Sequence, residues 1–408
     1  MLECVSLKIE SLVYEGYGLS RLPDGKAVFI PFVLPGEQVQ VRVIEEKRGH
    51  AIAELVSVEK PSPERIPPRC VHFGICGGCH YQHIPYNVEL DFKKAIFIEQ
   101  LQRMAGIKTP ILSNVIPSTP EWNYRNSLQF NLNNQGKLCF SDFYNNQLFE
   151  IKECHLPLTQ IGEVWPLAEF ESGIDIERVE YRQNGEGELI MVMRGGRPQM
   201  PELASESALS IVHQFGDDGI ILTGDGYLVM SIKDREFKVS AGSFFQTNFS
   251  GAEALLNCVS AAVKENNPLS ILEIYCGVGL LTSFLADSAE TIASIESSNL
   301  ASEDFIENLD AFDNISLFQG KAENILPNLE GQFDCILVDP PRAGLKREVT
   351  QAIIKKSPAV LVYVSCNPST LARDTKHLAY SGYHLESSTI VDMFPQTFHI
   401  ESVNIFRK

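Results

Sequence analysis

From Ala241 onward, short apolar runs alternate with longer segments of mixed polarity. This pattern is typical of strands alternating with helices, and it predicts a sheet of the α/β class. The runs at residues 269–275, 291–295, 333–338 and 359–364 are expected to be buried strands. Residues 241–408 are therefore predicted to form a Rossmann-like α/β domain, in which ligands meet the carboxyl ends of the strands.

Two further domains are expected before this one. Residues 1–60 carry short alternating apolar runs separated by glycine and proline, which indicates a small OB-like β-barrel. Residues 61–68 are too rich in proline for a helix or an inner strand. Residues 61–240 are predicted to form a central α+β domain, with a helix over residues 87–105.

Composition limits the class of protein. The 408 residues, of which 44% are hydrophobic, can form two to three domains with cores of their own. No apolar stretch is long enough to cross a membrane, and the first ten residues do not resemble a secretory signal. A cytoplasmic, monomeric protein that does not bind a membrane is expected.

The charge distribution bears on nucleic-acid binding. The formal net charge of -18 would repel a polyanion, but residues 1–110 contain 13 Lys and Arg against 13 Asp and Glu. An RNA-facing surface is therefore expected in the N-terminal part. Its candidate basic residues are Lys47, Arg48, Lys60, Arg65, Arg69, Lys93, Lys94 and Arg103.

A cysteine cluster suggests a metal site in the central domain. Cys70, Cys76 and Cys79 lie close together in a glycine-rich segment, and Cys154 follows much later. Four thiolates can bind one zinc ion or one iron–sulfur cluster, and the spacing does not decide between them. Because Cys154 is isolated rather than part of a second cysteine pair, an iron–sulfur cluster is favoured.

A nucleoside site is expected after the first strand of the α/β domain. Gly277 and Gly279 follow that strand, and glycines at such a turn let the backbone approach a ligand closely. Glu296 comes 19 residues after Gly277, at the end of the next strand, where an acid accepts hydrogen bonds from ribose hydroxyls. The third glycine of a dinucleotide fingerprint is absent, which favours S-adenosylmethionine over NAD.

Two more strands end in reactive groups. Asp339 follows the strand at residues 333–338, and Cys366 follows the strand at residues 359–364. Adjacent strand ends that both carry such groups beside a nucleoside site predict a catalytic centre.

At these motifs the chain resembles the 5-methyluridine RNA methyltransferase family, along essentially its whole length. The N-terminal barrel is similar to the TRAM domain that binds RNA in these enzymes, and the four cysteines are similar to the family's 4Fe-4S site. The other matching segments, in family order, are residues 243–248 (SFFQTN), 275–279 (YCGVG), 339–342 (DPPR), 365–368 (SCNP) and 394–401 (FPQTFHIE).

The resemblance implies transfer of a methyl group from S-adenosylmethionine to C5 of a uridine in RNA. Cys366 would be the nucleophile that adds to C6 of the uracil, and Glu401 the general base. Phe244 would stack on the flipped base. The implied cofactor ligands are Gln246, Tyr275, Gly277, Glu296 and Asp339. Large-subunit ribosomal RNA is the favoured substrate, and transfer RNA is the alternative.

Two positions depart from the pattern of some relatives, and other functions stay open. Leu280 replaces an Asn that contacts the cofactor, and Gln396 replaces a His, which weakens any histidine relay there. The other candidate functions are a cytosine-C5 or amino methyltransferase and a non-catalytic RNA-binding factor. Arg342 stands where amino methyltransferases have an aromatic residue, and Cys366 together with Glu401 argues against a non-catalytic role.

Overall fold

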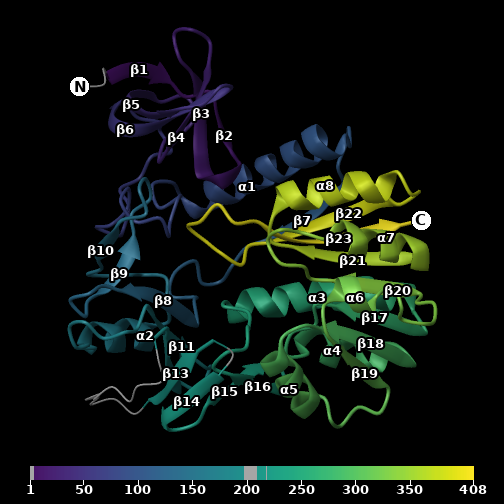
Figure 1. Ribbon diagram of the computed structural model, residues 1–408. Helices are drawn as coiled ribbons and strands as arrows, with labels where there is room; N and C mark the ends of the chain where they lie inside the picture. Colours follow the sequence, from purple (N-terminus) through teal and green to yellow (C-terminus); the bar gives the residue numbers. More distant parts are fainter. Residues whose placement is uncertain (1–3, 197–208, 217) are drawn as a thin grey trace. The chain divides into compact units, whose positions relative to one another are not determined.

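The computed structural model describes residues 4–196, 209–216 and 218–408 (Figure 1). The chain divides into two compact units. The first contains the residues up to Phe97 together with Cys139–His155 and Phe394–His399, and the second contains Ile98–Leu138, Leu156–Met393 and Ile400–Lys408. Helix α1 (Tyr86–Gln100) spans the boundary at Phe97. Within the described ranges, no helix combines the length and the apolar character needed to span a membrane.

The first unit begins with a six-stranded barrel. Its strands follow the order β1-β5-β6-β4-β3-β2. Ser20 of β3 donates a hydrogen bond to the carbonyl of Lys8 in β1 (2.7 Å), which links strands from opposite ends of this order. The bounds are β1 Cys4–Lys8, β2 Ser11–Val13, β3 Tyr17–Arg21, β4 Ala27–Pro31, β5 Gln38–Glu46 and β6 His50–Lys60.

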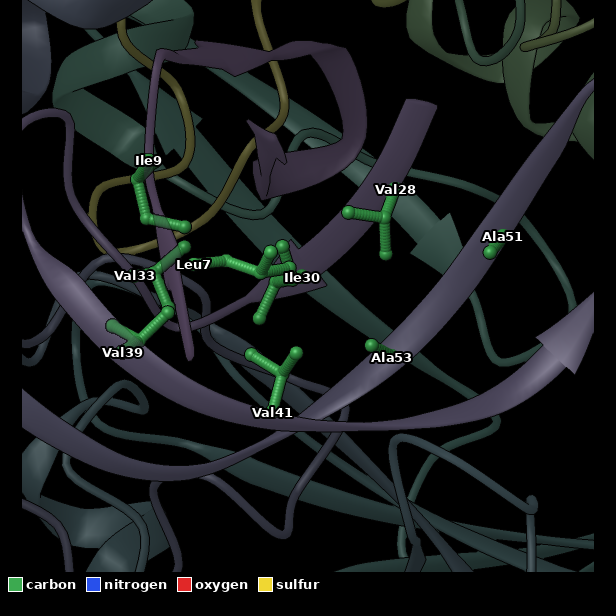
Figure 2. Packing of buried hydrophobic residues seen from close by; sticks show 9 residues of the cluster. All are labelled: Leu7, Ile9, Val28, Ile30, Val33, Val39, Val41, Ala51 and Ala53. Carbon is green, nitrogen blue, oxygen red and sulfur yellow. The ribbon is translucent and has the colours of Figure 1, made fainter. Parts of the chain in front are cut away.

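The barrel encloses a core of small and β-branched side chains. Alternate residues of the strands point inward, as the period-2 pattern of the sequence predicts. Figure 2 shows the cluster, which consists of Leu7, Ile9, Val28, Ile30, Val33, Val39, Val41, Ala51 and Ala53. The predicted barrel is therefore confirmed.

The first unit also contains the hairpin of β9 (Leu138–Ser141) and β10 (Leu148–Glu150) and most of α1. Inside α1, the fully buried Glu89 and Lys93 form an ion pair of 2.7 Å. The two side chains also hold the segment Phe394–His399: the backbone N–H of Gln396 donates to Glu89 (2.8 Å), and Lys93 donates to the carbonyl of Phe394 (3.1 Å). Because buried charges need such partners, this pair fixes the segment to the helix.

The second unit contains five neighbouring strands of a seven-stranded mixed sheet, in the order β8-β11-β12-β13-β14. The strands are β8 Ser127–Leu132, β11 Arg178–Gln183, β12 Leu189–Arg194, β13 Ser210–Phe215 and β14 Asp218–Thr223. Helix α2 (Thr159–Val164) packs on β11. The hairpin of β15 (Tyr227–Ile232) and β16 (Arg235–Ser240) then leads to helix α3 (Phe249–Asn266).

The largest sheet of the second unit has eight strands in the order β19-β18-β17-β20-β21-β23-β22-β7, and helices α3 to α8 flank it (Figure 1). β23 runs antiparallel to both of its neighbours. The strands of this sheet are β7 Leu112–Ile116, β17 Ser270–Ile274, β18 Thr291–Glu296, β19 Ile315–Gln319, β20 Cys335–Val338, β21 Val360–Ser365, β22 His384–Val391 and β23 Glu401–Arg407. The remaining helices are α4 Leu280–Leu285, α5 Asn299–Asn308, α6 Ala322–Ile325, α7 Arg347–Lys356 and α8 Pro368–Ala379.

The structure confirms the α/β class and the four expected strands, which are β17, β18, β20 and β21. The helix expected over residues 87–105 is α1 followed by a π-helical turn at Leu101–Ala105. That turn packs on α8, and Gln100 accepts a hydrogen bond from Ser369 (3.0 Å). Strand β7 was not expected from the sequence. The division into domains at residues 60 and 240 stays a prediction.

Candidate active site

The direction of the strand order reverses at β17. From β17 the chain moves outward to β18 and β19, and it then returns to the other side of β17 as β20 and β21. Ligands bind outside the carboxyl ends of the strands at such a switch point. The backbone N–H of Asp339, directly after β20, donates to the carbonyl of Ile274 at the end of β17 (3.3 Å). The two loops that flank the switch point are thus fixed to each other.

The turn after β17 needs unusual backbone geometry. Tyr275, Gly277 and Gly279 have positive φ angles of 70°, 57° and 91°. A Cβ at Gly279 would lie 2.4 Å from Leu309, so a side chain is excluded there by contact as well as by strain. A Cβ at Gly277 would meet no atom within 4 Å, so this side of the turn is open to a ligand.

Glu296, the last residue of β18, lies beside this turn. Its carboxylate accepts hydrogen bonds from the backbone N–H groups of Gly277 (3.0 Å), Ser297 (2.7 Å) and Ser298 (2.7 Å). The structure therefore brings together the glycine and the acid that the sequence pairs as a nucleoside site. Their arrangement fits a ligand with ribose hydroxyls, because a fixed carboxylate can accept from them.

Glu273 is a buried acid of this region that the sequence analysis missed. It lies within β17, is 1% exposed, and accepts a hydrogen bond from Thr282 in α4 (2.5 Å). Burial raises its pKa to about 8, and the nearby carboxylates of Asp339 and Glu296 add to the effect. The signal in the sequence was an acid inside an otherwise apolar run.

Cys366 and Glu401 lie at neighbouring strand ends. Ser365 of β21 is opposite Ser402 of β23, and the hydroxyl of Ser402 donates to the carbonyl of Ser365 (3.4 Å). The strands are antiparallel, so the next pair outward is Cys366 and Glu401. Asp339 lies at the end of β20, which is the other neighbour of β21. The structure thus gathers the three reactive residues at one edge of the sheet.

The electrostatics of this group favour its neutral forms. Burial raises the pKa of the half-buried Cys366 to about 12, with further contributions from the Glu401 and Asp339 carboxylates. Burial also raises the pKa of Asp339 to about 7; the carboxyl group is buried, although the residue as a whole is half-buried. The pKa of the buried Glu401 lies well above its usual range because of burial and the Asp339 charge. The positive charge of Arg342 acts in the opposite direction and lowers the pKa of both Cys366 and Glu401.

The loop at residues 243–248 presents two more of the expected residues. Phe244 is 68% exposed, whereas the next residue, Phe245, is buried. Gln246 is half-buried, and Asn248 caps helix α3 by accepting a hydrogen bond from Gly251 (3.1 Å). An exposed aromatic ring is available for stacking, because it is not part of the core.

The four cysteines belong to the first unit and are each half-buried. The Cys76 thiolate lies close enough to Cys154 and Cys70 for their charges to raise its pKa, although burial is the larger cause; the value is about 11. Backbone N–H groups point at two sulfurs, from His72 to Cys70 and from Gly78 to Cys76 (3.4 Å each). Across the described ranges, no three Cys, His, Asp or Glu side chains are placed as ligands of one metal ion. The donor set fits a thiolate-bound group, and the iron–sulfur cluster stays a prediction.

The basic residues expected to face RNA do not all do so. Lys93 is completely buried in its ion pair with Glu89, so that expectation was wrong. Arg65 holds the buried Glu37 through two hydrogen bonds, from Nε (2.5 Å) and Nη2 (2.7 Å). A buried carboxylate needs a nearby cation, so Arg65 has a structural role at Glu37.

The fold and the site together define a class I methyltransferase domain: its strand order contains one antiparallel strand, and a glycine turn and a carboxylate flank its switch point. A family model described as "tRNA (Uracil-5-)-methyltransferase" matches residues 217–408, and a TRAM domain model matches residues 3–56. The chain is 32% identical to an uncharacterized RNA methyltransferase of Aquifex aeolicus, over 98% of this chain and 97% of that protein. It is 31% identical to one of Halalkalibacterium halodurans, over 99% and 96%.

The chain belongs to this family of S-adenosylmethionine-dependent RNA uracil-C5 methyltransferases, and it carries a TRAM domain. Among solved structures, it is similar to the Pyrococcus abyssi tRNA (uracil-54, C5)-methyltransferase in complex with S-adenosyl-L-homocysteine. The TM-score is 0.75 at 23% identity, and the match covers 98% of this chain and 100% of that chain. This likeness confirms the fold.

Proposed function

We propose that the protein methylates C5 of a uracil in RNA through a covalent adduct between Cys366 and C6 of the base. The observation that carries this proposal is the position of Cys366 and Glu401, each one residue beyond the paired Ser365 and Ser402 of β21 and β23, where the Glu401 charge contributes to the raised pKa of Cys366. A nucleophile and a base at the ends of adjacent strands are held at a fixed separation. The reaction requires this, because addition to C6 and removal of the C5 proton take place on one small ring.

Cys366 is the proposed nucleophile. C5 of uracil is a weak nucleophile by itself, so a thiolate first adds to C6 and the ring becomes an enolate with electron density on C5. The pKa of Cys366 near 12 means that the thiol is protonated at rest and must lose its proton as it attacks. Asp339 and Glu401 are the carboxyl groups beside it, and the Arg342 cation favours the thiolate.

Glu401 is the proposed general base. After C5 has been methylated it still carries one proton, and removal of that proton expels the Cys366 sulfur and restores the C5–C6 double bond. A carboxylate with a raised pKa suits this step, because its basicity lies closer to that required for a carbon acid. The proton ends on Glu401 and the electron pair of the broken C–S bond returns to sulfur.

The residues at the switch point fit S-adenosylmethionine, which supplies an electrophilic methyl group when bound. We assign Glu296 to the ribose hydroxyls and the open Gly277 turn to close backbone contact. Tyr275, Gln246 and Asp339 complete the proposed set. Leu280, buried at the start of α4, offers no polar contact of its own, in line with its departure from the family pattern.

Phe244 is the proposed stacking platform for the uracil. A base inside folded RNA must leave its stack before C6 can be attacked, and an exposed aromatic ring replaces part of the lost stacking. The 68% exposure of Phe244 supports this role, since a Phe of the core would be covered.

We further propose that Cys70, Cys76, Cys79 and Cys154 bind a 4Fe-4S cluster. The N–H groups that point at the Cys70 and Cys76 sulfurs support thiolate ligation, because such hydrogen bonds stabilise negative charge on sulfur. Iron, sulfide and zinc analysis of anaerobically purified protein tests this. Four iron and four sulfide per chain are expected, and stoichiometric zinc would contradict the cluster.

The substrate is proposed to be large-subunit ribosomal RNA in the cytoplasm. Transfer RNA is the second candidate, because the structurally similar Pyrococcus abyssi protein is named as a transfer-RNA enzyme. Mass spectrometric mapping of RNA from cells with and without the protein distinguishes the two. Loss of one 5-methyluridine from ribosomal RNA supports the proposal, and loss from transfer RNA alone contradicts this choice of substrate.

The chemistry is tested by incubating the protein with S-adenosylmethionine and RNA from cells that lack it. We expect 5-methyluridine from the wild type and none from Cys366→Ala. Cys258→Ala is a matched control, because Cys258 is also half-buried but lies in α3. Formation of 5-methylcytidine or a methylated amino group instead would contradict the proposal.

A further inference from the structure

One loop carries two of the side chains assigned above, Phe244 and Gln246. Hydrogen bonds from two different side chains hold its backbone next to each of these residues. Residues 243–248 join β16 to α3 and present Phe244 and Gln246. Between these two, Phe245 is buried and packs against Phe237 of β16, with ring centroids 6.2 Å apart. A buried ring between two accessible residues limits how far movement at one of them reaches the other.

The first fixed point lies at Ser243, next to Phe244. Arg182 of β11 donates from Nη1 to the carbonyl of Ser243 (2.7 Å) and from Nε to Glu180 (2.6 Å). The other oxygen of Glu180 accepts from Arg194 of β12 (2.8 Å). Burial would raise the pKa of Glu180, but the two arginines outweigh it and lower the pKa, so this carboxylate stays charged and holds Arg182 in place.

The second fixed point lies at Gln246. The side-chain amide of Asn126, which is 2% exposed, donates to the carbonyl of Gln246 (2.9 Å). The backbone N–H of Asn126 donates to the carbonyl of Thr247 (2.8 Å). The backbone N–H of Gln183, next to Arg182, donates to the carbonyl of Asn126 (2.8 Å), so the two anchors are joined through the main chain. Their side chains nevertheless hold different carbonyls of the loop, Arg182 that of Ser243 and Asn126 that of Gln246.

We propose that Arg182 and Asn126 are positioning residues with separate tasks: Arg182 orients Phe244 for the RNA base, and Asn126 orients Gln246 for the cofactor. This inference rests on the proposed function, because it adopts the roles of Phe244 and Gln246. A guanidinium is required at position 182, since a single ammonium group cannot donate to the Glu180 carboxylate and the Ser243 carbonyl with the same fork geometry. An amide donor is required at position 126.

The test compares steady-state kinetics of Arg182→Lys and Asn126→Ala. Arg182→Lys keeps the charge beside Glu180 and thus the fold. It is expected to raise KM for RNA about tenfold and to leave KM for S-adenosylmethionine within about twofold. Asn126→Ala is expected to do the reverse, and to weaken binding of S-adenosylhomocysteine about tenfold in calorimetry. Asn126→Ser replaces it should the alanine variant not fold.

Two exposed residues close in sequence to Arg182 and Asn126 provide matched controls. Arg178→Lys on β11 and Gln129→Ala on β8 should change neither KM. Equal effects of the two test variants on both KM values, with unchanged melting temperature, would overturn separate positioning and show one shared structural role. Unchanged KM values in both Arg182→Lys and Asn126→Ala would also overturn the proposal. Failure of the proposed function is distinct, because the wild type itself would then form no 5-methyluridine.

Discussion

Cys366 and Glu401 are adjacent across the antiparallel pair of β21 and β23, one residue beyond the matched Ser365 and Ser402. β21 is buried along its whole length and β23 at five of its seven residues, so the core fixes the register of the two strands. A slip of one residue would turn Glu401 to the other face. The packing of these two strands therefore fixes where the proposed nucleophile and base lie relative to each other.

Glu401→Gln should stop the reaction after addition of Cys366 and methyl transfer, before the thiol is eliminated. Glutamine keeps the shape of the side chain but cannot accept the C5 proton, so turnover should fall by about 10² to 10⁴. The adduct of Cys366 with the methylated uracil of the RNA should accumulate, visible as a protein band shifted in denaturing gels. Glu386→Gln, at a partly exposed acid of β22 paired with Arg407, is the control and should turn over normally. Wild-type turnover of Glu401→Gln would contradict its role as base.

Alkylation of Cys366 should be slow and strongly dependent on pH. Because only the thiolate reacts and its pKa is about 12, the rate with iodoacetamide should still be rising at pH 10. Glu401→Gln removes a negative charge that raises this pKa, so the variant should react faster at pH 9. Mass spectrometry of the peptide that contains Cys366 measures both rates. A plateau near pH 8 in the wild type would show that the thiol is not shifted upward.

Glu273→Gln should stabilise the protein above neutral pH. The folded protein holds the Glu273 proton up to about pH 8, whereas an unfolded chain releases it near pH 4.5. Since the folded state then binds more protons, stability falls as pH rises from about 4.5 to 8, on the order of 3 kcal/mol by pH 7. Glutamine does not titrate, so this fall should shrink. Urea denaturation at pH 5 and pH 8 measures the free energy of unfolding. An equal fall in this free energy between the two pH values in the wild type and in Glu273→Gln would contradict the raised pKa of the buried acid.

The buried ion pair of α1 should contribute far more to stability than the exposed pair of Glu99 and Arg103, which joins the end of α1 to the π-helical turn after it. Lys93→Met leaves the buried Glu89 without its cation, and such a loss costs about 3–5 kcal/mol. Arg103→Met breaks the Glu99 pair, whose Arg side chain is 71% exposed, and should cost less than about 0.5 kcal/mol. Chemical denaturation compares the two. Similar losses in both variants would show that Lys93 is not buried as described.

The sequence was sufficient for local features of the fold. Apolar runs and glycine turns predicted β17, β18, β20 and β21 to within two residues at every end, because burial on both faces produces an unbroken apolar run. Strand β7 was not predicted, because it has five residues at the edge of the sheet and none of them is fully buried. Its pattern lacks the signal on which such predictions depend.

Relationships between distant segments could not be read in the same way. The insertion of β23 between β21 and β22 brings Glu401 beside Cys366, and no local pattern specifies that order. Lys93 looked like surface charge because its burial depends on tertiary packing, although its partner, Glu89, lies only four residues away on the same helix. The anchors Asn126 and Arg182 lie 120 and 61 residues from the atoms that they hold, so only the folded chain shows their purpose.

The central claim is that Cys366 attacks C6 of uracil, and 5-fluorouridine RNA tests it most directly. Fluorine at C5 cannot be removed as a proton, so the methylated adduct cannot break down. With S-adenosylmethionine present, the wild type should form a denaturant-stable complex whose digest carries one nucleotide on the peptide containing Cys366. Cys366→Ala should form none. An adduct on another residue, or one that persists in Cys366→Ala, would contradict the account.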